Sequence, residues 1–175
     1  MKAYQIDLYK NGNDNSLRFV LGSKGLKPLI VIGLNPSTAD ESKPDMTISK
    51  IIGFATRHNF DGFIMLNLYP QRATCPDDLD SNINVKIHKE NITAIIECLK
   101  DLKEINILAA WGEPIKKRDY LKQCISDIYN SLSHFSINWL QIGEMTASGH
   151  PRHPSRAAYE FGLITMDIKG YILTL

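Results

Sequence analysis

The chain has 175 residues, of which 43% are hydrophobic and 22% charged, and its formal net charge is +1. This composition is typical of one ordinary globular domain, and a charge near zero disfavours a protein that coats nucleic acid or membrane surfaces through charge alone. The sequence has no secretory signal and no apolar run of membrane-spanning length, so we expect a cytoplasmic protein without a membrane partner. Three widely spaced cysteines without a C-x-x-C pair also favour a reducing compartment.

The first 24 residues predict a β-hairpin. Strand-like runs at residues 3–9 and 17–21 flank the polar segment 10–15, which contains an Asn-Gly pair. Asn-Gly between two such runs is a hairpin signal. We therefore expect a single α/β domain over residues 1–175, in which residues 1–24 form a hairpin extension beside the main sheet.

Four later segments share one design, in which a short apolar run leads into a polar loop. The runs are residues 29–32, 62–66, 105–110 and 137–142. Runs that are apolar throughout suit strands that are covered on both faces. We therefore expect these four segments to be the buried strands of a parallel sheet.

Apolar stripes at helical spacing separate the strands, and we assign them to the core. The first helix has Asp45 or Thr47 as its candidate cap, and the third begins near Pro114, a residue tolerated in a first helical turn. Strands and helices that alternate in this way predict a three-layer α/β/α domain with a central, mostly parallel four-stranded sheet. The stripes are Ile48, Ile51, Ile52 and Ala55; Ile92, Ile95, Ile96 and Leu99; and Leu121, Cys124, Ile125, Ile128 and Leu132.

The carboxyl ends of parallel strands line one edge of a sheet, so four polar loops should meet at one crevice. The first loop reads Gly-Leu-Asn-Pro-Ser-Thr-Ala-Asp, and Asn35 before Pro36 keeps the chain extended there. Ser37 and Thr38 add short hydroxyl side chains. An Asn amide can orient a water molecule and Asp40 can act as a general base, but a turn with a helix cap uses the same residue types.

The second and third loops add an amide, a cation and an aromatic ring. Asn67 ends its strand, where its amide suits either the edge of a nucleobase or a bridge to another loop. Arg72 lies in a segment without acidic residues and can hold a phosphate or form a salt bridge to the first loop. Trp111, which precedes Gly112, can stack on a planar ligand, although a Trp at a strand end is more often part of the core.

The fourth loop is locally cationic, since it carries His150, Arg152, His153 and Arg156 without an acidic residue. A histidine here can donate to a developing anion, and the arginines can contact phosphate. The two histidines have a spacing seen in metal sites, but no nearby Cys and no H-E-x-x-H pattern supports one. We expect no metal and no cofactor.

Taken together, these motifs resemble an uncharacterised bacterial and phage family that carries a domain-of-unknown-function label. The resemblance spans roughly residues 15 to 160 and implies no activity. Its motifs are Asn35-Pro36-Ser37-Thr38-Ala39-Asp40, Asn67-Leu68-Tyr69 with Arg72-Ala73-Thr74, Ala110-Trp111-Gly112, and Gly149-His150-Pro151-Arg152-His153-Pro154.

More distantly, the chain resembles the uracil-DNA glycosylase superfamily. The segment Gly33–Ser37 is similar to its water-activating G-[IM]-N-P-G motif, and Asn67 ends a strand as the uracil-reading Asn of that superfamily does. Ala-Trp-Gly at 110–112 is similar to its L-W-G motif, and either His150-Pro151 or His153-Pro154-Ser155 is similar to its H-P-S motif. The resemblance implies a uracil-DNA glycosylase-like fold.

The resemblance also implies hydrolysis of an N-glycosidic bond in a nucleic acid or a nucleotide. Asn35, with Asp40, would position the water, and His150 or His153 would stabilise the departing base, without a cofactor. Since fold does not fix function, the alternative is a non-catalytic protein that binds a nucleotide or nucleic acid in the same crevice. In either case the residues expected to bind the ligand are Pro36, Ser37, Thr38, Asn67, Tyr69, Arg72, Trp111, Gly112 and Arg152.

Overall fold

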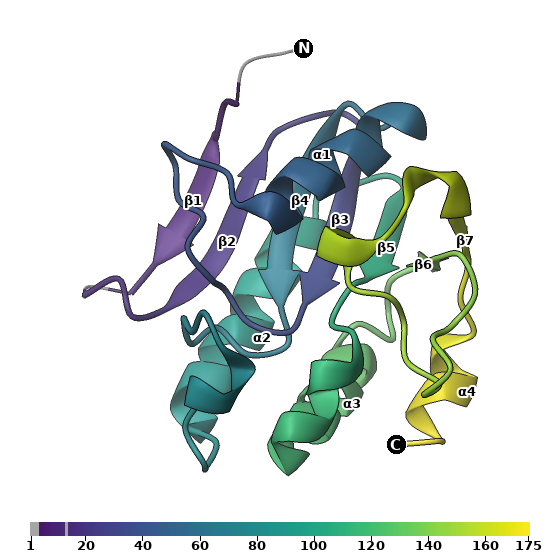
Figure 1. Ribbon diagram of the computed structural model, residues 1–175. Coiled ribbons are helices and arrows are strands. Elements are labelled where there is room, and N and C mark those ends of the chain that lie inside the picture. Colours follow the sequence, from purple (N-terminus) through teal and green to yellow (C-terminus); the bar gives the residue numbers. More distant parts are fainter. Residues whose placement is uncertain (1–3, 13) are drawn as a thin grey trace.

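The computed structural model describes residues 4–12 and 14–175, which form one seven-stranded sheet with helices on both faces (Figure 1). The strand order is β1-β2-β4-β3-β5-β6-β7. The strands are β1 (Leu8–Asn11), β2 (Arg18–Ser23), β3 (Pro28–Gly33), β4 (Gly62–Asn67), β5 (Ile105–Ala109), β6 (Ile137–Ile142) and β7 (Leu163–Thr165). The α-helices are α1 (Met46–Arg57), α2 (Val85–Leu99), α3 (Asp119–Ser131) and α4 (Ile168–Ile172).

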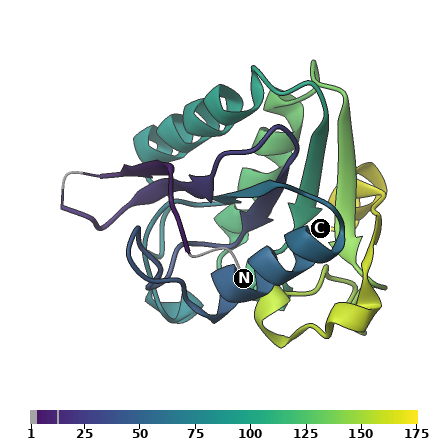
Figure 2. The same ribbon diagram turned by 90° about the horizontal axis from the view of Figure 1, so that it is seen from above.

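The two faces of the sheet bury separate cores. On β3, Ile30 and Ile32 pack in the core that α2, α3 and α4 share, whereas Leu29 and Val31 pack in the core that includes α1. Seen from above, α1 accordingly lies on one side of the sheet and α2 and α3 on the other (Figure 2). All residues of β3 and β4 are buried, which explains why their sequences are apolar throughout.

The expected fold class, a uracil-DNA glycosylase-like sheet of four mostly parallel strands, is wrong. The sheet has seven strands and is mixed: the β4–β3, β3–β5 and β5–β6 pairs are parallel, and the β1–β2, β2–β4 and β6–β7 pairs are antiparallel. The hairpin is part of the sheet, because Leu21 of β2 lies opposite Met65 of β4. Pairing between segments so distant leaves no local sequence signal, and β7, with three residues, is too short to show a period.

The predicted helices are present, with one shifted start. Asp45 caps α1, since its Oδ1 accepts a hydrogen bond from the backbone N–H of Ile48 at 2.8 Å. The third helix begins at Asp119 rather than near Pro114, because Glu113–Lys117 form a 3-10 turn and Arg118 is extended. No helix in the described part of the chain is both long and apolar enough to cross a membrane.

Strands β4, β3, β5 and β6 all end at the lower edge of the sheet in Figure 1. Backbone hydrogen bonds join their loops there: Leu68 N–H donates to the Gly33 carbonyl at 2.9 Å, and Ala110 N–H donates to the Ile32 carbonyl at 2.8 Å. The first three polar loops therefore begin from a rigid, hydrogen-bonded base.

Candidate functional site

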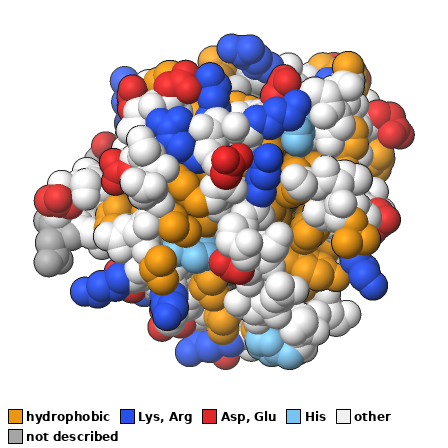
Figure 3. Space-filling model, turned by 90° about the horizontal axis from the view of Figure 1, so that it is seen from below, with side chains coloured by type: hydrophobic (Ala, Val, Ile, Leu, Met, Phe, Trp, Pro, Cys, Tyr) orange, Lys and Arg blue, Asp and Glu red, His pale blue; other side chains and the backbone are white. Residues whose placement is uncertain are grey.

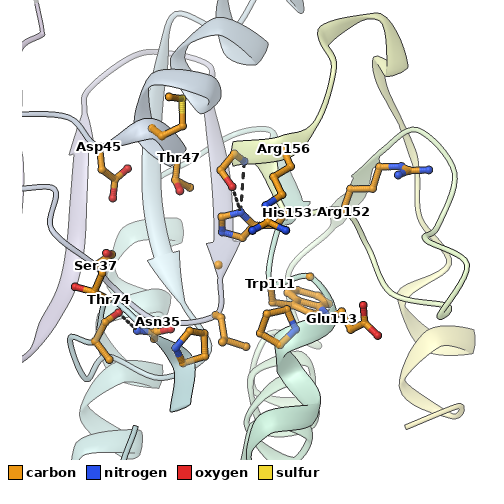
Figure 4. Close-up of a pocket in the computed structure, with 18 of the residues that line it drawn as sticks. Asn35, Ser37, Asp45, Thr47, Thr74, Trp111, Glu113, Arg152, His153 and Arg156 are labelled. Carbon is orange, nitrogen blue, oxygen red and sulfur yellow. Dashed lines mark hydrogen bonds between the residues drawn. The ribbon is translucent and has the colours of Figure 1, made fainter. Parts of the chain in front are cut away.

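A cavity of about 910 Å³ opens at this edge of the sheet. The loop after β3 and the amino end of α1 form one wall, and the loop after β5 and the segment after β6 form the other. Figure 4 shows Asn35, Ser37 and Asp45 on the first side, and Trp111, His153 and Arg156 across from them.

The structure brings together six of the residues that the sequence singled out as site residues and leaves seven outside. The cavity is lined by Asn35, Ser37, Trp111, Gly112, Arg152 and His153. Pro36, Thr38, Asp40, Asn67, Tyr69, Arg72 and His150 do not line it. Most of the seven support the wall from behind or lie in a neighbouring part of the fold.

Asn35 is half-buried in the cavity wall with its amide fixed. Its Nδ2 donates to the backbone carbonyls of Ala73 at 2.8 Å and Pro36 at 3.0 Å. Within the described residues its Oδ1 accepts no hydrogen bond. The side chain therefore offers an oriented acceptor, which suits a water molecule or a ligand N–H.

Asn67 is fully buried behind this wall. In the orientation that satisfies its amide, Nδ2 donates to the backbone carbonyls of Asn35 and Leu66, both at 3.3 Å. A Cβ atom added at Gly33 would lie 2.5 Å from Met65 Cε and 3.0 Å from Asn67 Oδ1, so a larger residue there would require these side chains to move. Asn67 therefore holds the backbone of Asn35 in place. Of the two roles that the sequence suggested for Asn67, this is the bridge to another loop.

Arg72 and Asp40 also form hydrogen bonds that hold the first loop in place. Arg72 Nη1 donates to the Ser37 carbonyl at 2.6 Å, and Nη2 donates to the Tyr9 hydroxyl at 2.7 Å. The Asp40 carboxylate accepts hydrogen bonds from the backbone N–H groups of Ser42 and Lys43, which lower the pKa of Asp40. Both side chains thus fix the shape of the loop.

The remaining expected residues lie apart from the cavity. Pro36 is buried in the first loop and Thr38 is exposed to solvent. Tyr69 is buried, and its hydroxyl accepts a hydrogen bond from the backbone N–H of Asn84 at 3.0 Å. These contacts place Tyr69 between the β4 loop and the start of α2.

His153 is the histidine that reaches the cavity. Its Nδ1 accepts from the Ser155 backbone N–H at 3.4 Å and lies 2.8 Å from the Ser155 hydroxyl. A backbone N–H can only donate, so Nδ1 carries no proton and the neutral ring holds its proton on Nε2. Burial lowers the pKa of His153 below its usual 6.5, which keeps the ring neutral at pH 7. Gly112, at φ +68°, leaves room for it, because a Cβ there would lie 3.1 Å from His153 Cβ.

His150 lies in a different environment. It is 5% exposed, and its Nδ1 is 2.9 Å from the Tyr171 hydroxyl, which accepts from Trp111 Nε1 at 3.0 Å. Its Nε2 is buried without a hydrogen-bond partner among the described residues. The structure therefore separates the two histidines, and only His153 shares a cavity with Asn35.

Sequence reasoning did not select two cavity residues, Arg18 and Asp45. Arg18 is 2% exposed, and burial, followed by the nearby charge of Arg72, lowers the pKa of Arg18 to about 10. The sequence marks Arg18 only as a basic residue at the start of the apolar strand run Arg-Phe-Val-Leu. Asp45 was predicted as a helix cap, which is confirmed, but its position in the cavity wall depends on the fold.

The cavity has an excess of positive charge. Its lining includes Arg18, Lys116, Lys117, Arg152 and Arg156, against the acidic Asp45 and Glu113. Lys117 is paired with Asp77 at 2.9 Å and Lys116 with Glu113 at 3.7 Å. On the face seen from below, basic and acidic side chains alternate with apolar ones between them (Figure 3). The positive charge is therefore a property of the cavity rather than of the whole face.

Metal ligands are not grouped in the described part of the chain, where no three His, Cys, Asp or Glu side chains cluster. The cavity instead combines a fixed amide, a neutral imidazole and cationic groups. These are groups that bind an anionic, hydrogen-bonding organic molecule.

The fold and the cavity together define an α/β protein with a cationic binding cavity at the carboxyl edge of a mixed sheet. The chain belongs to the family described as "Protein of unknown function (DUF1643)", which matches residues 18–155. The predicted membership of an uncharacterised family is confirmed. The matched range runs from Arg18 to Ser155, so it contains all of the cavity lining except Arg156 and Ala157. No curated protein and no solved structure matches the chain.

Proposed function

We propose that the protein hydrolyses the N-glycosidic bond between a nucleobase and its sugar, in a nucleotide or a nucleic acid. The observation that carries the proposal is that Asn35 and His153, from the first and fourth loops, line one cavity in complementary hydrogen-bonding states. Asn35 offers an acceptor and His153 offers a donor. The resemblance of their motifs to the water-activating and H-P-S motifs of uracil-DNA glycosylases supports the same pairing.

In the proposed hydrolysis, Asn35 on one wall of the cavity orients the water, and His153 on the other wall stabilises the departing base. Asn35 Oδ1 accepts a hydrogen bond from the attacking water and directs the water oxygen toward the anomeric carbon of the sugar. As the carbon–nitrogen bond breaks, its electron pair passes to the base. His153 Nε2–H then donates to the base oxygen that gains negative charge. A neutral imidazole suits this role, because it stabilises the anion by a hydrogen bond and needs no prior protonation.

Asp45 is the proposed acceptor of the proton that the water loses. It lines the same wall as Asn35, whereas the carboxylate of Asp40 is bound to two backbone amides outside the cavity. The other acidic residue of the cavity, Glu113, is paired with Lys116. Asp45 therefore takes the place for which the sequence suggested Asp40.

The test is a screen for base release from nucleotides and from single- and double-stranded oligonucleotides with normal and modified bases. The wild type should release a base, and His153→Ala should release it about 100- to 1,000-fold more slowly, the usual cost of losing one such donor. His134→Ala, at an exposed histidine, is the matched control and should act as the wild type does. No release across the panel, or undiminished release by His153→Ala, would contradict the proposal.

The second candidate function is binding of a nucleotide or nucleic acid without turnover. The observation in its favour is that the cavity keeps its cationic side chains, whereas Asn67, the expected base reader, is fully buried and directed to the backbone of Asn35. Nucleotide affinity without base release, which Asn35→Ala lowers, would select this function. Base release that Asn35→Ala abolishes while ligand affinity persists would exclude it.

A further inference from the structure

We propose that Arg18 and the amino end of α1 form an oxyanion subsite in the cavity wall, which holds a phosphate group of the ligand. The identification of that phosphate as part of a nucleotide rests on the proposed function, whereas the subsite itself rests on the contacts of Arg18. Neither the family match nor the sequence motifs assign a role to this residue.

The guanidinium of Arg18 is buried and forms no salt bridge with a described residue, although the charge of Asp45 is near enough to raise its pKa. Its Nη1 donates to the Ala39 carbonyl at 2.8 Å, and Nε has no partner among the described residues. Nη2 likewise makes no hydrogen bond with a described residue, and no described carboxylate oxygen lies within 4.0 Å of the group. Nε–H and Nη2–H point along the same edge of a guanidinium, which is the edge that binds an oxyanion through two parallel hydrogen bonds.

A second guanidinium increases the local charge. Arg72 approaches the same Ala39 carbonyl with Nη1 and Nη2, both at 3.4 Å. One neutral carbonyl therefore receives two cations, and the Arg72 charge contributes to the lowered pKa of Arg18. Asp45 is the acidic residue whose charge acts on Arg18, and Asp40 is the one that acts on Arg72, but neither forms a salt bridge with them. A phosphate beside Arg18 would supply the direct ionic partner that its guanidinium lacks.

The amino end of α1 completes the subsite. Met46, Thr47 and Ile48 line the cavity, and α1 has 12 residues, so its first turn presents unpaired N–H groups and the positive end of the helix dipole. Asp45 is the acidic group that an anion meets here, but its Oδ1 is held by the N–H of Ile48. The N–H groups of Met46 and Thr47 remain for a ligand.

These donors match the oxygen atoms of a phosphate monoester or diester. Ser37, whose side chain also lines the cavity, adds a hydroxyl donor on the same wall. His153 lies across the cavity from Ser37 and Asp45 (Figure 4). A ligand that spans the cavity would therefore place its phosphate at Arg18 and the amino end of α1, and its base at His153. The geometry thus selects phosphorylated ligands over free nucleosides.

The first measurement is the unfolding midpoint of the full chain in inorganic phosphate and in chloride at equal ionic strength. A ligand that binds only the folded state raises the midpoint, so phosphate should stabilise the wild type. Arg18→Gln should fold in chloride and respond to phosphate less than the wild type, because it keeps only the general stabilisation that phosphate gives a folded protein and loses the binding charge. Arg57→Gln, at an exposed arginine of α1, is the control and should respond as the wild type does.

The second measurement compares a nucleoside, its monophosphate and a short single-stranded oligonucleotide of the same base by calorimetry. Arg18→Gln should weaken monophosphate binding by about 10- to 100-fold, the usual effect of losing a charge-assisted contact, and change nucleoside binding less than twofold. Tighter binding of the monophosphate than of the oligonucleotide identifies a terminal phosphate, and the reverse order identifies a backbone diester.

Arg18→Lys covers the case in which Arg18→Gln does not fold. It keeps the charge but loses the two-pronged edge, so monophosphate affinity should fall several-fold. A wild type without phosphate response, or an Arg18 variant that binds monophosphate as the wild type does, would overturn the subsite. Since neither measurement needs turnover, phosphate binding without base release would reject only the proposed hydrolysis.

Discussion

His150 and His153 lie three residues apart on one loop, yet they occupy opposite environments. Tyr171 is protonated, because burial raises its pKa to about 12, and its hydroxyl accepts from Trp111. The Tyr171 hydroxyl and His150 Nδ1 share a hydrogen bond of 2.9 Å, and the tautomer in which the hydroxyl donates has the ring proton on Nε2. In His153 it is the backbone N–H of Ser155 that assigns the proton to Nε2.

The difference between them is what the Nε2–H group can reach. In His150 it is buried in protein, and in His153 the ring lines the cavity. A repeated His-Pro motif thus supplies one histidine buried in the protein and one that faces the cavity. The following predictions test this difference between the two histidines.

The largest expected effect on stability is that of His150→Ala. The change removes a buried ring and its hydrogen bond to Tyr171, so the free energy of unfolding should fall by about 2–4 kcal/mol in urea denaturation. The matched change His153→Ala removes a half-buried ring and should cost about 1 kcal/mol or less. Equal losses in the two variants would contradict the assignment of different roles.

Trp111→Phe tests the connection between the two environments. It removes the Nε1–H donor to the Tyr171 hydroxyl and leaves a smaller ring in a fully buried position. We expect a loss of about 1–2 kcal/mol in the free energy of unfolding. Trp139→Phe, at the other tryptophan, is the control for the change in ring size, because its indole makes no hydrogen bond within the described residues. A loss no larger than in the control would show that the Trp111–Tyr171 hydrogen bond contributes nothing.

The sequence was sufficient to predict the buried strands and the capped helix α1, because apolar runs and an Asp cap are local signals. It was not sufficient for the sheet as a whole. The pairing of β2 with β4 joins residues such as Leu21 and Met65, which only the tertiary fold brings together. The predicted fold class was therefore wrong in the number and direction of the strands, which depend on pairing between distant segments.

For the site, too, the sequence predicted the local features and not the contacts between distant segments. A polar residue at a strand end predicts a partner, but the partner of Asn67 is the backbone of Asn35, and that of Arg72 is the first loop. Arg18 belongs to a hairpin strand rather than to a polar loop, so the loop argument did not reach it. Polarity could be read from single residues, whereas access to the cavity depends on packing.

The pH dependence of stability should reflect both histidines. Burial lowers the pKa of His150 and of His153 below the usual 6.5. Below pH 6.5 the unfolded chain therefore binds more protons than the folded one, so the free energy of unfolding decreases as the pH falls and is independent of these groups above that range. Urea denaturation between pH 7.5 and about 5.5 checks this sign. In His150→Gln and in His153→Gln the slope should be smaller, and a slope unchanged in both would contradict it.

Ser155→Ala should have the smallest effect, because it removes only one of the two contacts of His153 Nδ1. The backbone N–H at 3.4 Å remains, so the proton should stay on Nε2 while the ring loses the hydroxyl at 2.8 Å that orients it. Nitrogen NMR of the imidazole reports the tautomer without any turnover, and Ser136→Ala, at an exposed serine, is the control. If base release is found, Ser155→Ala should slow it by less than about tenfold, since a positioning contact is lost and the donor is kept. A shift of the proton to Nδ1 would mean that the hydroxyl, and not the backbone amide, makes His153 a donor toward the cavity.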